Sequence, residues 1–145
     1  MRRSGRASLL AILATLSAVV VVVLLFFGSE SAQSVGSRFM SALAKGDVEG
    51  LTKLSYMEGK TPEEIKEKWA YATQKVAPYY RFVWRPVSST EIDKDTANVK
   101  VEVVTDALSG QSYPEFFELP MRKVDGQWKI EVGAIDRKMY PGLPR

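Results

Sequence analysis

The feature that most constrains the fold is a change in the spacing of apolar residues at Pro78. Before Pro78, apolar residues recur every three or four positions, which is typical of amphipathic helices. After Pro78, apolar residues alternate with polar ones, which is typical of strands buried on one face. The chain has 145 residues, enough for about one domain. This order of helices followed by strands predicts an α+β domain.

Two helices are predicted before residue 55. Apolar residues one turn apart mark the first of them: Val35, Phe39 and Leu43. Gly46 is suited to end this helix, because glycine readily adopts the left-handed backbone of a C-cap. Asp47 follows at once, and its carboxylate is suited to cap a second, short helix.

A third helix is predicted to begin at Pro62. Thr61 precedes it as a cap, and Glu64 completes a capping box. The apolar spacing predicts an inward face, and Pro78 is predicted to stop the helix. The residues of that inward face are Ile65, Trp69, Ala72 and Val76.

Alternating runs predict four strands, at residues 80–85, 98–103, 116–122 and 127–132. Asp125 and Gly126 between the last two fit a two-residue hairpin turn. Pro120 lacks an N–H group, so we expect it at a sheet edge or a bulge. Together these patterns predict three helices packed on a curved, four-stranded antiparallel sheet.

The N-terminal region carries a basic flank at residues 1–8 and an uncharged apolar run at residues 9–27. As a helix, that run would extend about 28 Å, close to the thickness of a hydrocarbon core. Arginines before the run and Glu30 after it predict a cytoplasmic N-terminus. We therefore expect a single-pass anchor in the lipid bilayer of the cell (inner) membrane, with the domain in the periplasm or outside the cell. A cleaved signal peptide is the alternative, although the run is longer than usual.

Charge and composition exclude several functions. The sequence pI of about 9.1 invites a nucleic-acid interpretation, but Arg2, Arg3 and Arg6 account for the whole net charge of +3. The rest of the chain is neutral, so we expect no nucleic-acid binding. The chain has no cysteine and no histidine, which removes disulfides, thiolate catalysis and the commonest metal ligand and general base. We expect no metal and no cofactor, and the oligomeric state stays open.

Two segments carry a resemblance to a known fold. FMSALAKGDVEGLTKLS (residues 39–55) resembles the opening of many small exported proteins of the nuclear transport factor 2-like fold, also called cystatin-like and shared by ketosteroid isomerase. VDGQWKI (residues 124–130) is similar to their last hairpin. The resemblance covers residues 34–134, after a linker at 28–33. It implies a cavity between the sheet and the long helix, which enzymes of this fold use. Membrane-anchored domains of this fold also serve as inner-membrane parts of bacterial secretion machines, so the resemblance implies a scaffold or accessory-subunit role as well.

Aromatic side chains on the predicted inward faces are the candidate pocket lining. They are Trp69, Tyr80, Trp84, Phe117 and Trp128. Such residues either fill the core or line a pocket for a hydrophobic ligand. No carboxylate occupies a predicted inward position, so no catalytic residue is assigned. Asp106 and Tyr113, near a strand end, either line the mouth of the cavity or are solvated loop residues.

The last segment, residues 135–145, is predicted to be an extended C-terminal tail. It carries apolar residues between prolines, unlike a solvent-exposed tail. Met139, Tyr140 and Leu143 either pack on the domain itself or dock a partner as an extended segment.

The functional expectation is a membrane-anchored extracytoplasmic module that binds or assembles with other membrane or envelope proteins. In this interpretation the chain is a non-catalytic accessory subunit of a membrane-associated complex. The alternative is a carrier of a small hydrophobic ligand, or an enzyme, that uses the cavity between helix and sheet.

Overall fold

A computed structural model describes residues 30–106, 110 and 112–145. The chain divides into two units, Met1–Glu30 and Ser31–Arg145, and the description below concerns the second. The predicted basic flank and membrane anchor lie outside the described residues. Among the residues that are described, no helix is long and apolar enough to cross a bilayer.

Three α-helices and a π-helix precede the main strands: α2 (Ala32–Lys45), α3 (Val48–Leu54), α4 (Pro62–Tyr71) and η1 (Ala72–Val76). The helix α2 begins inside the segment that was predicted as a linker. Its end is as predicted, because Gly46 adopts a left-handed backbone with φ of 67°. The Asp47 carboxylate caps α3 by accepting a 3.0 Å hydrogen bond from the Gly50 N–H. Both halves of the capping box are present at the start of α4, between Thr61 and Glu64.

The end of the third helix differs from the prediction. At Ala72 the α-helical pattern gives way to a π-helix, in which the Ala77 N–H donates to the Ala72 carbonyl oxygen at 2.9 Å. A π-turn contains an extra residue and therefore rotates the following side chains around the axis. The prediction that Val76 faces inward is wrong, since 42% of its surface is exposed, and Thr73 is buried instead.

The strands form one mixed sheet of five, in the order β1-β5-β4-β3-β2. They are β1 (Ser55–Tyr56), β2 (Phe82–Glu91), β3 (Thr96–Thr105), β4 (Glu115–Val124) and β5 (Gln127–Glu131). Four pair antiparallel as predicted, but β1 pairs parallel to β5, so the prediction of a four-stranded antiparallel sheet is wrong. Two residues are too few for an alternating pattern to reveal a strand.

The turns and prolines of the sheet follow their local chemistry. Asp125 and Gly126 have φ values of 52° and 76°, as the predicted two-residue hairpin requires. Pro120 pairs with Asn98 of β3, whereas β5 pairs with β4 only from Met121 onward. The β5 side of β4 is therefore a local edge at Pro120, which is the position that a residue without an N–H tolerates.

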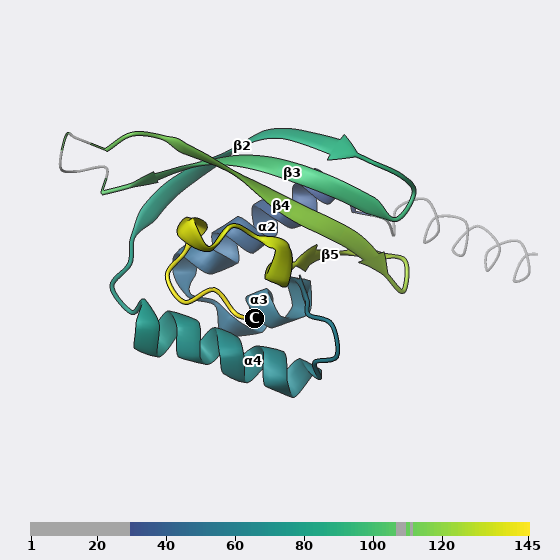
Figure 1. Cartoon of the computed structure of the whole chain (residues 1–145), viewed down its shortest axis with the longest axis horizontal. Coiled ribbons are helices and arrows are strands. Elements are labelled where there is room, and N and C mark those ends of the chain that lie inside the picture. The colour runs from purple at the N-terminus through teal and green to yellow at the C-terminus, as the bar shows by residue number, and fades with distance from the viewer. Residues whose placement is uncertain (1–29, 107–109, 111) are drawn as a thin grey trace, which may run out of the picture. The chain divides into compact units, whose positions relative to one another are not determined.

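The core lies between the helices and one face of the sheet (Figure 1). Helix α2 approaches β3 closely at Gly36, where an added Cβ would lie 3.0 Å from Val99 Cγ1. Trp69 of α4 is fully buried and packs edge-on against Phe39 of α2, with ring centroids 5.8 Å apart. Its indole N–H donates to the Ser55 hydroxyl at 2.8 Å. This bond ties α4 to the start of β1.

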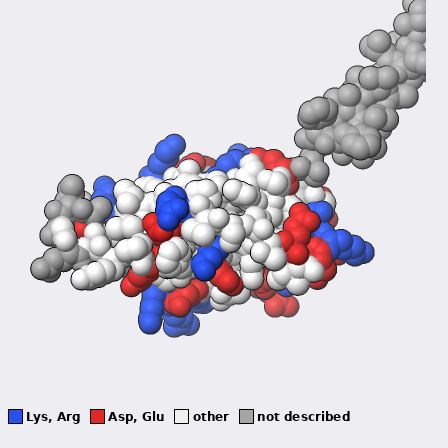
Figure 2. All heavy atoms as spheres, turned by 90° about the horizontal axis from the view of Figure 1, so that it is seen from above, with Lys and Arg blue, Asp and Glu red and all other residues white. Residues whose placement is uncertain are grey.

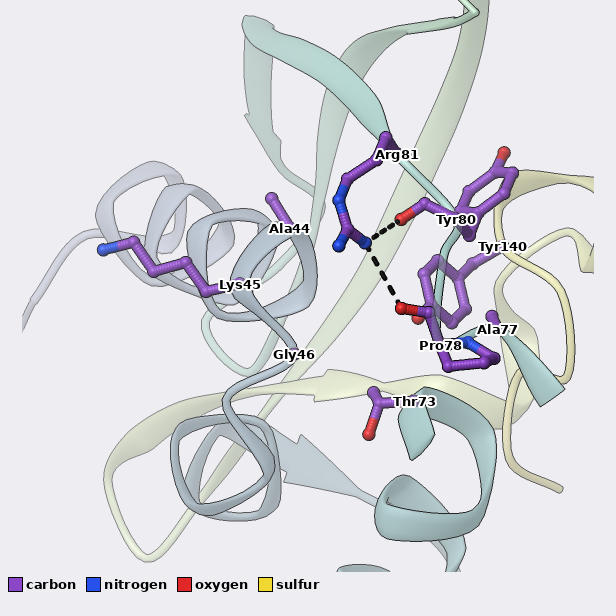
Figure 3. A pocket seen from close by; sticks show the side chains of 9 residues that line it. All are labelled: Ala44, Lys45, Gly46, Thr73, Ala77, Pro78, Tyr80, Arg81 and Tyr140. Atoms are coloured by element: carbon purple, nitrogen blue, oxygen red, sulfur yellow. Dashed lines mark hydrogen bonds between the residues drawn. The ribbon is translucent and has the colours of Figure 1, made fainter. Parts of the chain in front are cut away.

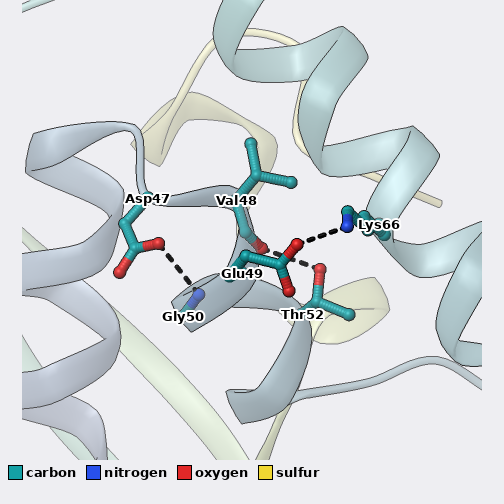
Figure 4. A network of polar contacts seen from close by, with 6 residues as sticks. All are labelled: Asp47, Val48, Glu49, Gly50, Thr52 and Lys66. Carbon is teal, nitrogen blue, oxygen red and sulfur yellow. Dashed lines mark hydrogen bonds and ion pairs between the residues drawn. The ribbon is translucent and has the colours of Figure 1, made fainter.

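One ion pair joins α3 to α4 (Figure 4). The Lys66 ammonium of α4 forms an ion pair with the Glu49 carboxylate of α3. Both side chains are more than half exposed, so we expect this pair to contribute little to stability.

Candidate functional site

The predicted interior pocket is occupied by the core itself. Trp69, Phe117 and Trp128 expose 0%, 7% and 6% of their surfaces and belong to the buried apolar cluster. Tyr80 and Trp84 are half-buried and pack against that cluster from β2 and the segment before it. The structure therefore brings the five aromatic residues to one core, and among them only Tyr80 lines the cavity described below.

The C-terminal segment packs into the same unit. Met139, Tyr140 and Leu143 expose only 1%, 2% and 8% of their surfaces. The segment is not simply extended, because Arg137–Met139 forms a short 3-10 helix. The Arg145 guanidinium holds its end by donating to the Val132 and Ile135 carbonyl oxygens, at 2.8 and 2.9 Å. These contacts place the segment on its own domain.

A cavity of about 320 Å³ lies where the end of α2, the end of η1, the start of β2 and the C-terminal segment meet (Figure 3). Its lining consists of Ala44, Lys45, Gly46, Thr73, Ala77, Pro78, Tyr80, Arg81 and Tyr140. The rings of Tyr80 and Tyr140 form an edge-on pair with centroids 5.2 Å apart. A residue predicted for the pocket and one predicted for the tail thus meet at one site.

Arg81 is the charged group that faces this cavity. Figure 3 shows its guanidinium over the cavity and the Lys45 ammonium pointing away from it. One Arg81 nitrogen, Nη1, donates to the Tyr80 carbonyl oxygen at 3.0 Å and to the Pro78 carbonyl oxygen at 3.4 Å. None of the nine described residues in the lining is acidic. The cavity therefore presents a positive charge to whatever enters it.

Both tyrosines of the cavity hold their protons firmly. Burial raises the pKa of Tyr80, and the nearby Glu115 carboxylate raises it further. Burial also raises the pKa of Tyr140, with a further contribution from Tyr80 and an opposing one from the positive charge of Arg81. Since the ordinary value is 10.0, both hydroxyls are protonated at neutral pH and can donate hydrogen bonds.

The outer face of the sheet carries a second candidate site, which we call the outer patch: Val83, Val104 and Phe116. Val83 and Phe116 are 56% and 52% exposed, and Val83 pairs directly with Val104 across β2 and β3. The Lys100 ammonium lies 5.1 Å from the centre of the Phe116 ring. A shallow depression of about 100 Å³ lies between β2 and β3 at this patch. Figure 2 shows that charges of both signs are scattered over this side of the domain.

An ion pair borders the outer patch. The Arg85 guanidinium donates twice to the Glu102 carboxylate, at 3.0 and 2.5 Å. This pairing lowers the pKa of Glu102 and raises that of Arg85. Asp106 and Tyr113, for which a cavity mouth and a solvated loop were both left open, are exposed and do not line the 320 Å³ cavity. Within the described residues, no acidic cluster suited to a metal ion is present.

No family model matches the sequence, and no curated protein resembles it closely enough in sequence to count as a relative. Solved structures are similar in shape. A domain of unknown function with a cystatin-like fold from Nostoc punctiforme has a TM-score of 0.50 and 16% identity, over 68% of this chain and 70% of that one. A protein from Thiobacillus denitrificans, assigned as a calcium/calmodulin-dependent protein kinase type II association domain, has a TM-score of 0.50 and 10% identity, over 70% and 90%.

A ketosteroid isomerase-like protein from Erwinia carotovora is also similar, with a TM-score of 0.48 and 14% identity, over 67% of this chain and 85% of that one. At these identities the likeness concerns the fold alone. The likeness to the Nostoc punctiforme structure shows that the described domain has a cystatin-like fold, as the sequence resemblance implied.

Proposed function

We propose that the chain is a single-pass membrane protein whose extracytoplasmic domain is a non-catalytic binding and assembly module. The apolar run at residues 9–27 would be the anchor, and the arginines before it would keep the N-terminus in the cytoplasm. The fully buried cluster around Trp69 supports a binding module over a carrier, because a carrier of a hydrophobic ligand needs an apolar interior space.

The observation that carries the proposal is the outer patch. Val83 and Phe116 each expose more than half of their surface on a sheet face that no described helix covers (Figure 1). Apolar side chains grouped at neighbouring positions, with charged groups at their rim, are typical of protein-binding surfaces. Lys100, Arg85 and Glu102 provide such a rim. We propose that another membrane or envelope protein covers this patch.

One solved structure of similar fold is assigned as an association domain. We propose that this chain, too, associates with other proteins. The fold itself hosts unrelated functions, so the outer patch has to be tested directly.

Site-specific cross-linking tests the outer patch. A photoreactive residue at position 116 in the full-length chain should form one discrete adduct in intact membranes. Val83→Glu should abolish that adduct, because it places a charge in the apolar contact. Ile92→Glu is the matched control, since Ile92 is 63% exposed and follows the last residue of β2, at the end away from the patch. An adduct that survives Val83→Glu, or that Ile92→Glu abolishes equally, would refute the proposed surface.

Membrane fractionation tests the anchor separately. The full-length chain should remain in the pellet after extraction with alkaline carbonate, and protease added outside the cytoplasmic membrane should reach the domain. Release of the chain by carbonate would exclude the anchor, but it would not bear on the proposal that the outer patch binds a protein.

A further inference from the structure

The hydroxyl group of Tyr140 has no hydrogen-bond partner among the described residues, although the residue is only 2% exposed. Among the described residues, however, every fully buried side-chain nitrogen or oxygen has a hydrogen-bond partner. The Tyr140 hydroxyl must therefore border open space. Tyr140 lines the 320 Å³ cavity, and we infer that the hydroxyl faces this space. A protonated donor, held in place by a buried ring, thus faces the cavity.

Arg81 faces the same cavity with donors to spare. Its Nη1 atom donates to the Pro78 and Tyr80 carbonyl oxygens, which holds the guanidinium against the segment between η1 and β2. The remaining Nε and Nη2 donors form the fork that binds a carboxylate through two parallel hydrogen bonds. The positive charge of Arg81 opposes part of the rise in the pKa of Tyr140, which places the two groups within electrostatic reach.

The rest of the cavity limits the charge and size of a ligand. The C-terminal end of α2 contributes Ala44, Lys45 and Gly46, and the end of a helix carries a partial negative charge. The Glu115 carboxylate adds a second negative influence next to Tyr80. Both offset part of the positive charge of Arg81, so the cavity suits a single anionic group rather than two. A volume of about 320 Å³ is at the small end of ligand cavities.

From this arrangement we propose that the cavity binds a small organic monocarboxylate, with its carboxylate on Arg81 and the Tyr140 hydroxyl. The apolar body of the ligand lies against Ala77 and the paired rings of Tyr80 and Tyr140. The site is separate from the outer patch, so this inference does not depend on the proposed assembly function.

Titration with benzoate tests the site, with benzamide and benzylamine as uncharged and cationic probes of similar shape. The full-length chain in mild detergent should bind benzoate saturably, with a Kd between about micromolar and millimolar. Binding of benzamide should be at least about tenfold weaker, since it lacks the charge that pairs with Arg81. Equal binding of benzamide or benzylamine, or no saturable binding of benzoate, would overturn the proposal.

Two variants assign the residues. Arg81→Gln should weaken benzoate binding about 10- to 100-fold, and Tyr140→Phe about two- to tenfold, because the first removes a charged donor pair and the second a single hydroxyl. Arg85→Gln and Tyr113→Phe are the controls, since Arg85 pairs with Glu102 on the outer face and Tyr113 is 82% exposed. Circular dichroism verifies that each variant is folded. Unchanged affinity in a folded Arg81→Gln variant would refute the assignment.

Discussion

The hydrogen bonds between Trp69, Ser55 and Leu51 provide the sharpest test of how the core is held together. The Trp69 indole N–H donates to the Ser55 hydroxyl at 2.8 Å, and that hydroxyl donates to the Leu51 carbonyl oxygen at 2.6 Å. All three residues are buried. The Ser55 backbone N–H bonds to the Thr52 carbonyl instead, so it does not replace the hydroxyl at Leu51. Ser55→Ala would therefore leave a donor and an acceptor unpaired in the core.

The expected loss follows from these two orphaned groups. Each buried polar group without a partner costs about 1–3 kcal/mol. We expect Ser55→Ala to lower the free energy of unfolding by about 2–4 kcal/mol, because both groups lose their partner and neither reaches solvent. For a domain of this size, each kcal/mol corresponds to a decrease of about 4 °C in Tm.

A double-mutant cycle with Trp69→Phe distinguishes this mechanism from a simple loss of volume. Trp69→Phe removes the indole donor, so it should cost less in the Ser55→Ala background than in the wild type. The coupling free energy should be about 1 kcal/mol or more. Urea denaturation of the full-length chain, followed by far-UV circular dichroism, measures all four proteins. Ser89→Ala, on exposed β2, is the control. Additive effects, or a loss below about 0.5 kcal/mol for Ser55→Ala, would refute the reasoning.

Two further predictions concern the C-terminal segment. Gly142→Ala should destabilise the domain by about 1–3 kcal/mol in urea denaturation, since φ is +71° and the new Cβ would lie 2.7 Å from Val76 Cγ1. Gly126→Ala is the control, because φ is +76° there and no atom lies within 4 Å of the new Cβ, so it should destabilise the domain less. Equal losses of stability in the two variants would exclude the contact with Val76. The raised pKa values of Tyr80 and Tyr140 predict that the contribution of these two phenols to stability is constant below about pH 10 and falls above it, because the unfolded chain then loses these protons first. Measured against pH by thermal denaturation, the fall should be smaller in Tyr140→Phe, and an identical pH profile would contradict a buried phenol.

Local chemistry explains which parts of the fold could be predicted. The caps at Gly46, Asp47 and Thr61 and the hairpin at Asp125 each depend on a few neighbouring residues, and the structure has each of them. The parallel strand β1 depends instead on where Ser55 and Tyr56 lie relative to β5, which is 75 residues away at Ile130. The π-helix at Ala72 depends on tertiary packing in the same way, and nothing in the apolar spacing of α4 distinguishes it from an α-helix.

The candidate sites were harder to predict than the fold, because their residues come together only when the C-terminal segment packs on the domain. Apolar spacing assigned Tyr80 to a pocket and left two interpretations open for Tyr140, but only the folded chain shows that their rings pair at 5.2 Å. Once Met139 and Leu143 are buried, the segment occupies apolar space that a hydrophobic ligand would otherwise need. What remains is a smaller cavity with Arg81 and the Tyr140 hydroxyl facing it. The packing of the last residues thus changes the ligand expected from a hydrophobic molecule to a small carboxylate.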